Sequence, residues 1–419
     1  MMSTPKTVNV NSAWMLFFLF VPFVLPEFLV HNAPSYLYRI LQIVQVACLI
    51  FLICTSLKIR LKLNPVLICI FLYEFVFFIF TLLNGGALLS FLYNAVTELF
   101  LAILACYLVE TKTLEPFSRI AKIYFFILMS LNLLSVIVFY PEGMYFTTDR
   151  TQNYFLGFDN IHVLTFLLGI TLSLVSDYYK NGLRKISVFT LVLICISLFT
   201  TLYYWSVTSM CVLLVFLLFV VFRKALSKRS LINSVVVSIL NISAAVLFLV
   251  PSFQNAVFGG FAHLFGKSAT FSGRTDIWEA SIDAICNNYG LGYGFMTSEQ
   301  AIELVTFSHP HQQYLSTTFY TGFIGLIILL LIVVLITRVT YKSRRNLLVV
   351  CFVGLWAAIM LRWNLTSGNL YIQFFEMVLI YGFSASVLGE TKPTESTKAS
   401  SKKGLSRHSY TSSSSLWNS

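Results

Sequence analysis

Long apolar segments separated by short polar ones run along most of this chain of 419 residues. A helix needs about twenty mostly apolar residues to cross the hydrocarbon core of a membrane. The segments are continuously apolar, which favours helices over the alternating strands of a barrel. The pattern therefore predicts an all-α polytopic membrane protein with about twelve transmembrane helices. They are expected at residues 14–31, 40–57, 65–84, 88–108, 120–140, 161–178, 186–203, 206–222, 231–250, 313–337, 346–363 and 370–388.

One long polar interruption separates the ninth expected helix from the tenth. The chain divides into nine helices over residues 1–250, a large loop over 251–312, three helices over 313–388 and a tail over 389–419. The tail is rich in Ser, Thr and Lys, a composition typical of disordered segments. The first apolar segment lacks a small-residue cleavage site, so we expect a retained helix and not a signal peptide.

Within the large loop, apolar residues recur at helical spacing between Arg274 and Asn287. The residues that share one side are Ile277, Trp278, Ile282 and Ile285. The Asn-, Gly- and Tyr-rich residues 287–294 that follow are typical of turns. We expect a short amphipathic helix that lies along the membrane surface or covers the end of the bundle.

Composition and charge agree with this class of protein. Hydrophobic residues make up 58% of the chain and charged residues 11%, with a mean hydropathy of +0.82, which excludes an ordinary soluble domain. With the N-terminus in the cytoplasm, 23 of the 28 Lys and Arg residues fall on the inner side, as the positive-inside rule requires. Topology then accounts for the net charge of +11. The large loop is expected outside, and no nucleic-acid partner is expected.

Three of the few outer basic residues are candidates for binding an anion. Arg274 begins the loop helix, Arg362 ends the eleventh expected helix, and Arg150 lies in the outer loop 141–160. A guanidinium matches the oxygens of a phosphate group well. Simpler roles remain open: a membrane anchor for Arg274, a snorkelling charge for Arg362, and an ion pair with its neighbour for Arg150.

Two histidines, His309 and His311, precede the tenth expected helix. An imidazole can accept a proton from an attacking hydroxyl group near neutral pH, which makes His311 a candidate general base. An interfacial polar residue at a helix start is the alternative. No third ligand accompanies the pair, and no cysteine spacing suggests zinc, so neither a metal site nor a cofactor is expected.

Two further sets of polar residues are candidates. Asp159, Asn160 and His162 stand where the loop 141–160 enters the sixth expected helix. They are candidates for lining one cavity together with the basic residues and histidines named above. Carboxylates inside spans often mark ion or proton routes, so they keep a transporter function open. These carboxylates are Glu27, Glu74, Glu98 and Glu376.

The loop and the helices after it resemble a known superfamily. Residues 272–278 (Ser-Gly-Arg-Thr-Asp-Ile-Trp), followed by 289–294 (Tyr-Gly-Leu-Gly-Tyr-Gly), look like the outer loop of the Wzy-type polysaccharide polymerases and O-antigen ligases. Residues 311–315 (His-Gln-Gln-Tyr-Leu) stand where that group has a His-Asn motif, and 320–326 stand at its Gly-Gly-Leu-like pattern. Arg362, before Trp363 and Asn364, fits the late arginine of the group.

The motifs cover about a quarter of the chain, residues 270–370, and the rest agrees only in topology. Two departures stand out. Gln312 replaces the usual Asn, and residues 203–206 (Tyr-Tyr-Trp-Ser) lack the arginine that the group often has at this position.

The resemblance implies a GT-C-like, metal-independent glycosyltransferase in a bacterial cytoplasmic (inner) membrane, with both termini in the cytoplasm. The implied donor is a glycan on undecaprenyl pyrophosphate, presented at the outer face. Arg274, Arg362 and Arg150 would stabilise the departing pyrophosphate, and His311 would deprotonate the acceptor hydroxyl in an inverting attack. The other implied substrate contacts are His309, Tyr293, Phe295 and Tyr314, although lipid contact explains the aromatic residues equally well.

Polymerisation of lipid-linked oligosaccharide repeat units is the first hypothesis, with undecaprenyl-pyrophosphate-linked oligosaccharide, membrane lipid and a chain-length regulator as the expected partners. An O-antigen ligase, which transfers the glycan to lipid A core, shares this chemistry, and the motifs do not separate the two. A transporter of lipid-linked sugars is the third hypothesis. It would need polar residues spread through the bundle and usually an internal repeat, and neither is seen.

Overall fold

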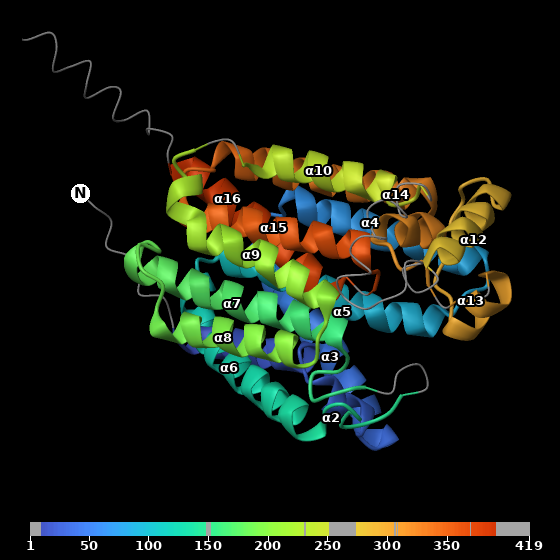
Figure 1. Cartoon of the computed structure of the whole chain (residues 1–419), viewed down its shortest axis with the longest axis horizontal. Helices are drawn as coiled ribbons and strands as arrows, with labels where there is room; N and C mark the ends of the chain where they lie inside the picture. Colours follow the sequence, from blue (N-terminus) through green and yellow to red (C-terminus); the bar gives the residue numbers. More distant parts are fainter. Residues whose placement is uncertain are drawn as a thin grey trace, which may run out of the picture.

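The computed structural model describes residues 10–147, 152–229, 232–250, 274–305, 307, 309–368 and 370–390, without the side chains of Val10, Asn11, Asp159, Asn160, Arg274 and Glu390. Helices account for most of this part of the chain (Figure 1). They are α1 (Val10–Phe20), the 3₁₀ helix η1 (Val21–Phe23), α2 (Glu27–His31), α3 (Ser35–Lys58), α4 (Pro65–Leu83), α5 (Leu88–Glu110), α6 (Leu114–Phe139), α7 (Asp159–Asn181), α8 (Val188–Tyr203), α9 (Val207–Leu226), α10 (Ser234–Leu247), α12 (Arg274–Asn287), α13 (Ser298–Val305), α14 (Gln313–Lys342), α15 (Leu347–Leu365) and α16 (Tyr371–Glu390).

The helices confirm the predicted class. In the described ranges, nine helices are long and apolar enough to cross a membrane. Three shorter apolar helices, Ser12–Phe23, Val188–Tyr203 and Ser234–Leu247, stand at further expected positions. The chain is a multi-pass, all-α membrane protein.

The first expected helix, 14–31, is wrong as a single span. Helix α1 passes into η1 at Val21, and α2 begins only at Glu27. Pro22 and Pro26 explain the break, because proline lacks the N–H that a helix interior needs and its ring clashes with the preceding turn. The irregular residues between the two prolines line the cavity described below.

Side-chain caps set the first residues of α4, α8, α9, α10 and α15. In each, a side-chain oxygen of the capping residue accepts a hydrogen bond from a backbone N–H two or three positions later. A cap of this kind is worth about 1 kcal/mol, because it satisfies a donor that the first turn leaves over. The caps are Asn64, Ser187, Ser206, Asn233 and Asn346. The cap at Ser206 separates α9 from α8, with only Tyr204, Trp205 and Ser206 itself between the two helices.

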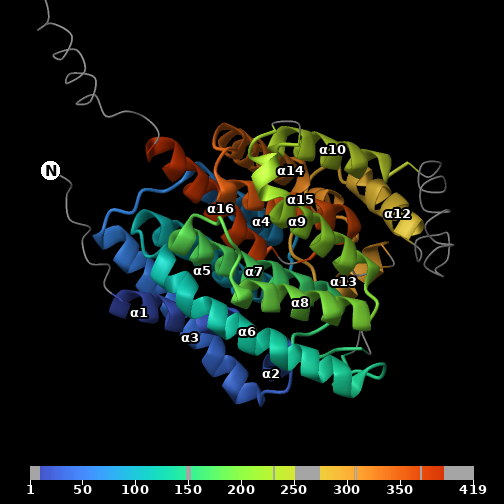
Figure 2. The same ribbon diagram turned by 60° about the vertical axis from the view of Figure 1, so that its left-hand side comes forward.

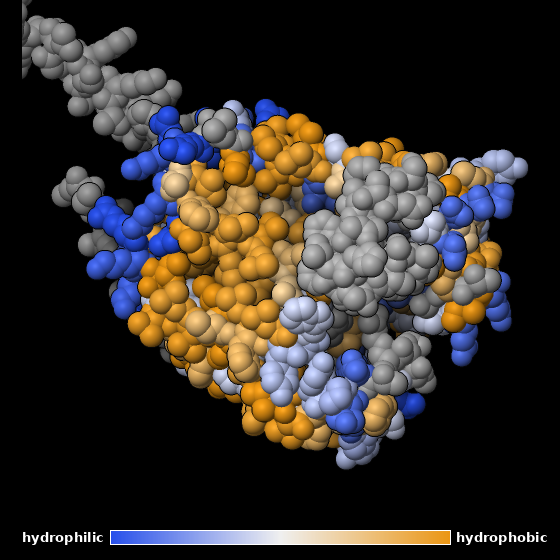
Figure 3. All heavy atoms as spheres, in the orientation of Figure 1, coloured by the Kyte–Doolittle hydropathy of each residue, from blue (hydrophilic) through white to orange (hydrophobic). Residues whose placement is uncertain are grey.

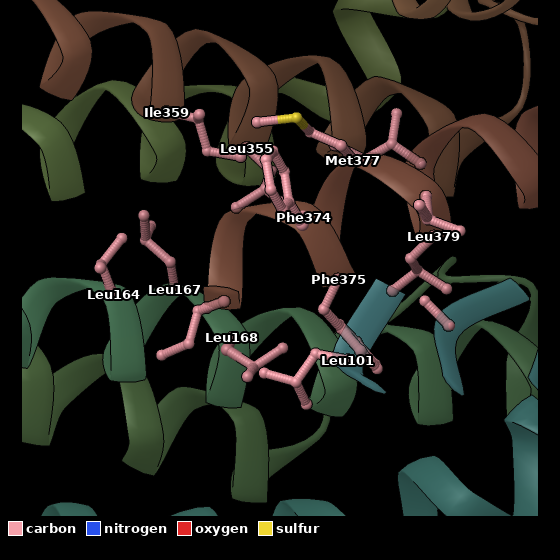
Figure 4. Close-up of a cluster of buried hydrophobic side chains, with 14 of the residues drawn as sticks. Leu101, Leu164, Leu167, Leu168, Leu355, Ile359, Phe374, Phe375, Met377 and Leu379 are labelled. Atoms are coloured by element: carbon pink, nitrogen blue, oxygen red, sulfur yellow. The ribbon is translucent and has the colours of Figure 1, made fainter. Parts of the chain in front are cut away.

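Helices α7, α15 and α16 form the centre of the bundle. In α7 and α15, 89% of the spanning window is buried, against 22% in α3 at the edge. Side chains of the three central helices interdigitate with each other and with Leu101 of α5 (Figure 4). Lipid tails are as apolar as these side chains, so close packing contributes much of the association energy.

On the face shown in Figure 3, apolar residues cover the middle of the bundle, and polar residues gather toward its two ends. The loops α3–α4, α5–α6, α7–α8, α9–α10 and α14–α15 carry Lys and Arg residues and share one end, because successive spans run in opposite directions. Helices α12 and α13 cover the other end (Figures 1 and 2). We refer to these as the basic end and the loop end.

Helix α12 occupies the residues expected for the loop helix, and it packs on α14 and α13. Trp278 and Ile285, on its apolar side, are buried in a cluster with Phe319 of α14. Helix α13 was not expected from the sequence, because its eight residues are too few for a clear periodic pattern. Both helices cover the end of the bundle.

The segment that follows α12 forms backbone hydrogen bonds to α14 where that helix is interrupted. Gly322 has φ 66° and ψ −174°, which interrupts the helix. The carbonyl groups of Phe319 and Tyr320 instead accept hydrogen bonds from the backbone N–H groups of Tyr293 and Gly294, each at 2.9 Å. The loop segment thus replaces hydrogen bonds that the broken helix cannot form.

The same segment, residues 290–295, which we call the glycine strap, is also bound to the turn between α4 and α5. The N–H of Phe295 donates to Thr81 Oγ1 at 3.0 Å, and the Asn84 side chain donates to the Gly292 carbonyl at 3.0 Å. The N–H of Ala87 donates to the Phe295 carbonyl at 2.9 Å. The strap therefore joins the α4–α5 hairpin to α14 across the loop end.

Asn132 fixes the outer loop that precedes α7. Its buried side chain accepts a hydrogen bond from the Leu156 N–H at 2.9 Å, and its amide nitrogen lies 3.5 Å from Nδ1 of His162. The other ring nitrogen of His162 lies 2.8 Å from the Gly157 carbonyl oxygen. His162 is completely buried and anchors this loop; it does not line the cavity described below.

We expect Asn132→Ala to lower the free energy of unfolding by about 1–3 kcal/mol, because the Leu156 N–H would be left buried without its acceptor. Thermal unfolding of the purified protein in detergent measures the change. Asn181→Ala is the control, since Asn181 makes an exposed hydrogen bond to the Lys185 carbonyl. Equal shifts in the two variants would contradict this role for Asn132.

Candidate active site

A polar cavity of about 980 Å³ lies at the loop end of the bundle. Its walls come from the η1–α2 segment, α3, α4, α5, α7, the first turns of α14, and the segment between α15 and α16. The glycine strap contributes Phe295. The cavity has the size of a ligand site and is lined by both polar and aromatic groups.

Arg362 supplies a buried positive charge to this cavity. It lies in the last turn of α15, where a cation is favoured by the helix dipole, and it is 3% exposed. Its charge interacts with Glu376 and Tyr371 of α16. Gly368 lies beside the guanidinium and leaves room next to it, since a Cβ atom there would be 3.9 Å from Nη2 of Arg362.

His309 and His311 line the same cavity, with ring centroids 3.9 Å apart. His311 has a φ of 54°, an unusual conformation for a residue other than glycine, and the chain enters α14 directly after it. The structure thus brings three of the expected residues, His309, His311 and Arg362, to one cavity.

The two glutamines at the start of α14 have different surroundings. Gln313 lines the cavity and accepts a hydrogen bond from the Gly368 N–H at 3.3 Å. Gln312 is 1% exposed and donates to the Ala245 carbonyl of α10 at 3.0 Å. The residue that departs from the family motif therefore ties α14 to α10.

Tyr293 and Tyr314 are packed into the protein and do not line the cavity. The Tyr293 hydroxyl donates to the Ala284 carbonyl at 2.8 Å, and its ring packs 5.0 Å from that of Phe319. Partial burial raises the pKa of Tyr293, which keeps this donor protonated. Tyr314 is 9% exposed, and its ring packs edge-on against Trp363.

Other aromatic side chains form much of the cavity wall. Phe77 of α4 packs against Phe91, Phe295 and Tyr320, with ring centroids 5.1, 5.9 and 6.0 Å away. All four rings line the cavity. Only Phe295 was expected among them, because the sequence does not distinguish an aromatic residue on a cavity wall from one that faces lipid.

Three of the four intramembrane carboxylates also line the cavity: Glu27, Glu74 and Glu98. The carboxyl groups of Glu74 on α4 and Glu98 on α5 interact with each other, and Oε1 of Glu98 accepts a hydrogen bond from the Leu370 N–H at 3.1 Å. The sequence placed these acids inside spans, but it gave no sign that they share a cavity with Arg362.

The roles of Arg274 and Arg150 in binding an anion stay predictions. Arg274 is the first residue of α12, but its side chain lies outside the described part of the structure, as does all of Arg150. The side chains of Asp159 and Asn160 are outside it too. Within the described ranges, no group of three His, Cys, Asp or Glu side chains is arranged to hold a metal ion.

Comparison with known proteins finds a family model that matches the middle of the chain. Residues 186–330 match the family model described as O-antigen ligase (Wzy_C). This match confirms the resemblance to the polysaccharide polymerase and O-antigen ligase superfamily. No curated protein matches the chain.

The Wzy_C segment runs from the start of α8 to the middle of α14. It includes α12, the glycine strap, His309 and His311. Arg362 and the carboxylates come from helices outside it, so the cavity combines the Wzy_C segment with the rest of the bundle.

Proposed function

We propose that this protein polymerises lipid-linked oligosaccharide repeat units for a bacterial surface polysaccharide, and that it acts at the outer face of the cytoplasmic membrane. The observation that carries the proposal is the cavity in which the His309–His311 pair of the Wzy_C segment lies with the buried Arg362. The excess of Lys and Arg at the basic end supports a cytoplasmic location for that end and for both termini.

In the proposed reaction, a hydroxyl group of the acceptor sugar attacks the anomeric carbon of the donor glycan. The new glycosidic bond forms as the bond from that carbon to the pyrophosphate oxygen breaks, and the electron pair leaves with undecaprenyl pyrophosphate. Arg362, with Arg274 and Arg150, stabilises the charge on this leaving group. His311 takes the proton of the hydroxyl group, and His309 and Gln313 contact the substrate.

The cavity also suits an O-antigen ligase, and the match to the O-antigen ligase family model favours this alternative. A ligase would run the same displacement with lipid A core as the acceptor. The two functions differ in product: a polymerase forms a ladder of chain lengths from the repeat unit alone, and a ligase adds one glycan to lipid A core.

We expect purified protein to form a chelator-resistant ladder from a lipid-linked repeat unit. His311→Ala should lower the rate of transfer by about 100-fold, because the proton acceptor is lost. His31→Ala is the control, since His31 ends α2 and does not line the cavity. Gel electrophoresis of the products measures the ladder and the rate of transfer for wild type and for both variants. A single added band on lipid A core, without a ladder, would show that the protein is a ligase and not a polymerase. No transfer to either acceptor would favour a transporter.

A further inference from the structure

The wall formed by α3, α4 and α5 contains a pair of buried carboxyl groups. Glu74 and Glu98 are 5% and 8% exposed, and their carboxyl groups interact with each other. Two neighbouring carboxylates that are both removed from water repel each other, so one proton shared by the pair is favoured. Glu98 accepts the Leu370 N–H, a hydrogen bond that favours the charged form of its carboxyl group.

Two acceptor oxygens on this wall have no hydrogen-bond partner among the described residues. They are Oε1 of Glu74 and Oε1 of Gln45, a residue of α3 that is 4% exposed and whose amide donates to the Pro22 carbonyl at 2.8 Å. Both side chains line the cavity. A buried acceptor without a donor costs about 1–3 kcal/mol. The two oxygens have almost no accessible surface, so a ligand that carries O–H groups would recover this energy once the side chains turn toward the cavity.

The neighbouring surface has the other property that a sugar ring needs. Tyr73, Phe77 and Phe91 line the cavity next to the carboxyl pair, on the same two helices. Aromatic rings offer a flat apolar surface for the C–H face of a sugar, and the oxygens of Glu74, Glu98 and Gln45 accept hydrogen bonds from its hydroxyl groups.

The cavity lining carries charges of both signs. Among the described lining residues, Arg362, His309 and His311 supply the basic groups, and Glu27, Glu74 and Glu98 supply the acidic ones. Tyr371 lies within electrostatic reach of both Arg362 and Glu98. A pyrophosphate is favoured near Arg362, whereas a second anion near Glu98 would be repelled.

We propose that Glu74, Glu98 and Gln45 form a subsite for an uncharged sugar of the glycan, which is bound through its hydroxyl groups, and that the subsite excludes acidic sugars such as uronic acids. This inference rests on the proposed function and specifies the substrate class of the same cavity.

The test compares the binding of three probes to the full-length protein in lipid nanodiscs: bare undecaprenyl pyrophosphate, and the same lipid carrying glucose or glucuronic acid. Wild type should bind the glucose probe at least about tenfold more tightly than the glucuronic acid probe, since like charges are strongly unfavourable in a desolvated site. The double variant Glu74→Gln, Glu98→Gln should lose this preference. Glu110→Gln, an exposed acid at the basic end, should keep it.

Equal binding of the two sugar probes by wild type would overturn the subsite, and so would an unchanged preference in the double variant. If the double variant does not fold, Gln45→Met decides. It should weaken binding of the glucose probe and leave bare undecaprenyl pyrophosphate unaffected, and no change would overturn the proposal. Wild type that binds none of the three lipids would instead overturn the proposed function itself.

Discussion

Arg362→Ala should lower the rate of glycosyl transfer by about 10²- to 10³-fold, the largest loss that we expect from one substitution in the cavity. Arg362 is almost completely buried, so its charge would act on the pyrophosphate of the proposed substrate with little screening by water. Its removal would also leave Glu376, which is fully buried in α16, without a neighbouring positive charge. The loss should appear in a single-turnover assay with a lipid-linked repeat unit.

Arg362→Lys separates charge from shape. Lysine keeps the positive charge near Glu376 but cannot present two parallel N–H groups to a phosphate, so we expect a smaller loss of about tenfold. Arg345→Ala is the matched control, because Arg345 is an exposed arginine of the α14–α15 loop at the basic end. Transfer at the wild-type rate by Arg362→Ala would remove this residue from the mechanism.

Gly294→Ala should strongly reduce the amount of folded protein. Gly294 has a φ of 76°, and a Cβ atom there would lie 2.5 Å from Cα of Thr81 and 2.6 Å from the Phe80 carbonyl oxygen. These contacts are with backbone atoms, which cannot rotate away. Left-handed strain costs about 1–2 kcal/mol, and the overlap should add about 1–3 kcal/mol.

Gly85→Ala carries only the first of these two costs, so its comparison with Gly294→Ala isolates the cost of the overlap. Gly85 has a similar φ of 63°, but no atom lies within 4 Å of an added Cβ. The thermal unfolding temperatures of Gly294→Ala and Gly85→Ala in detergent should therefore differ clearly, with Gly294→Ala the less stable. Equal unfolding temperatures would show that the contact between the glycine strap and α4 is not tight.

The spans could be predicted from the sequence because each one depends on a property of a single segment. A continuous apolar run is sufficient for a span, and α12 was predicted from the spacing of residues such as Trp278 and Ile285. The break near Pro22 was also readable, since proline interrupts a helix wherever it stands in the interior. The prediction gave it too little weight against the length of the apolar run.

The cavity could not be predicted, because it depends on which helices are neighbours. Glu98 belongs to the site only because α5 packs against α16, which brings the Leu370 N–H to its carboxylate. Tyr293 shows the opposite case: its place in a motif suggested a substrate contact, but its hydroxyl donates to Ala284. His309, His311 and Arg362 could be chosen as candidates because polar residues at the ends of apolar segments stand out in the sequence, and the structure brings these three to one cavity.

The carboxyl pair has a consequence for the biogenesis of the protein. Glu74 and Glu98 lie on consecutive helices joined by the short turn 84–87, so the α4–α5 hairpin can enter the membrane with its two carboxyl groups already paired. The backbone donor that completes their hydrogen bonding, the Leu370 N–H, belongs to a residue 272 positions after Glu98 and is synthesised much later. An isolated carboxylate at this depth would cost several kcal/mol. The pairing therefore lowers the free-energy cost of holding the α4–α5 hairpin in the bilayer before Leu370 and the last helix are synthesised.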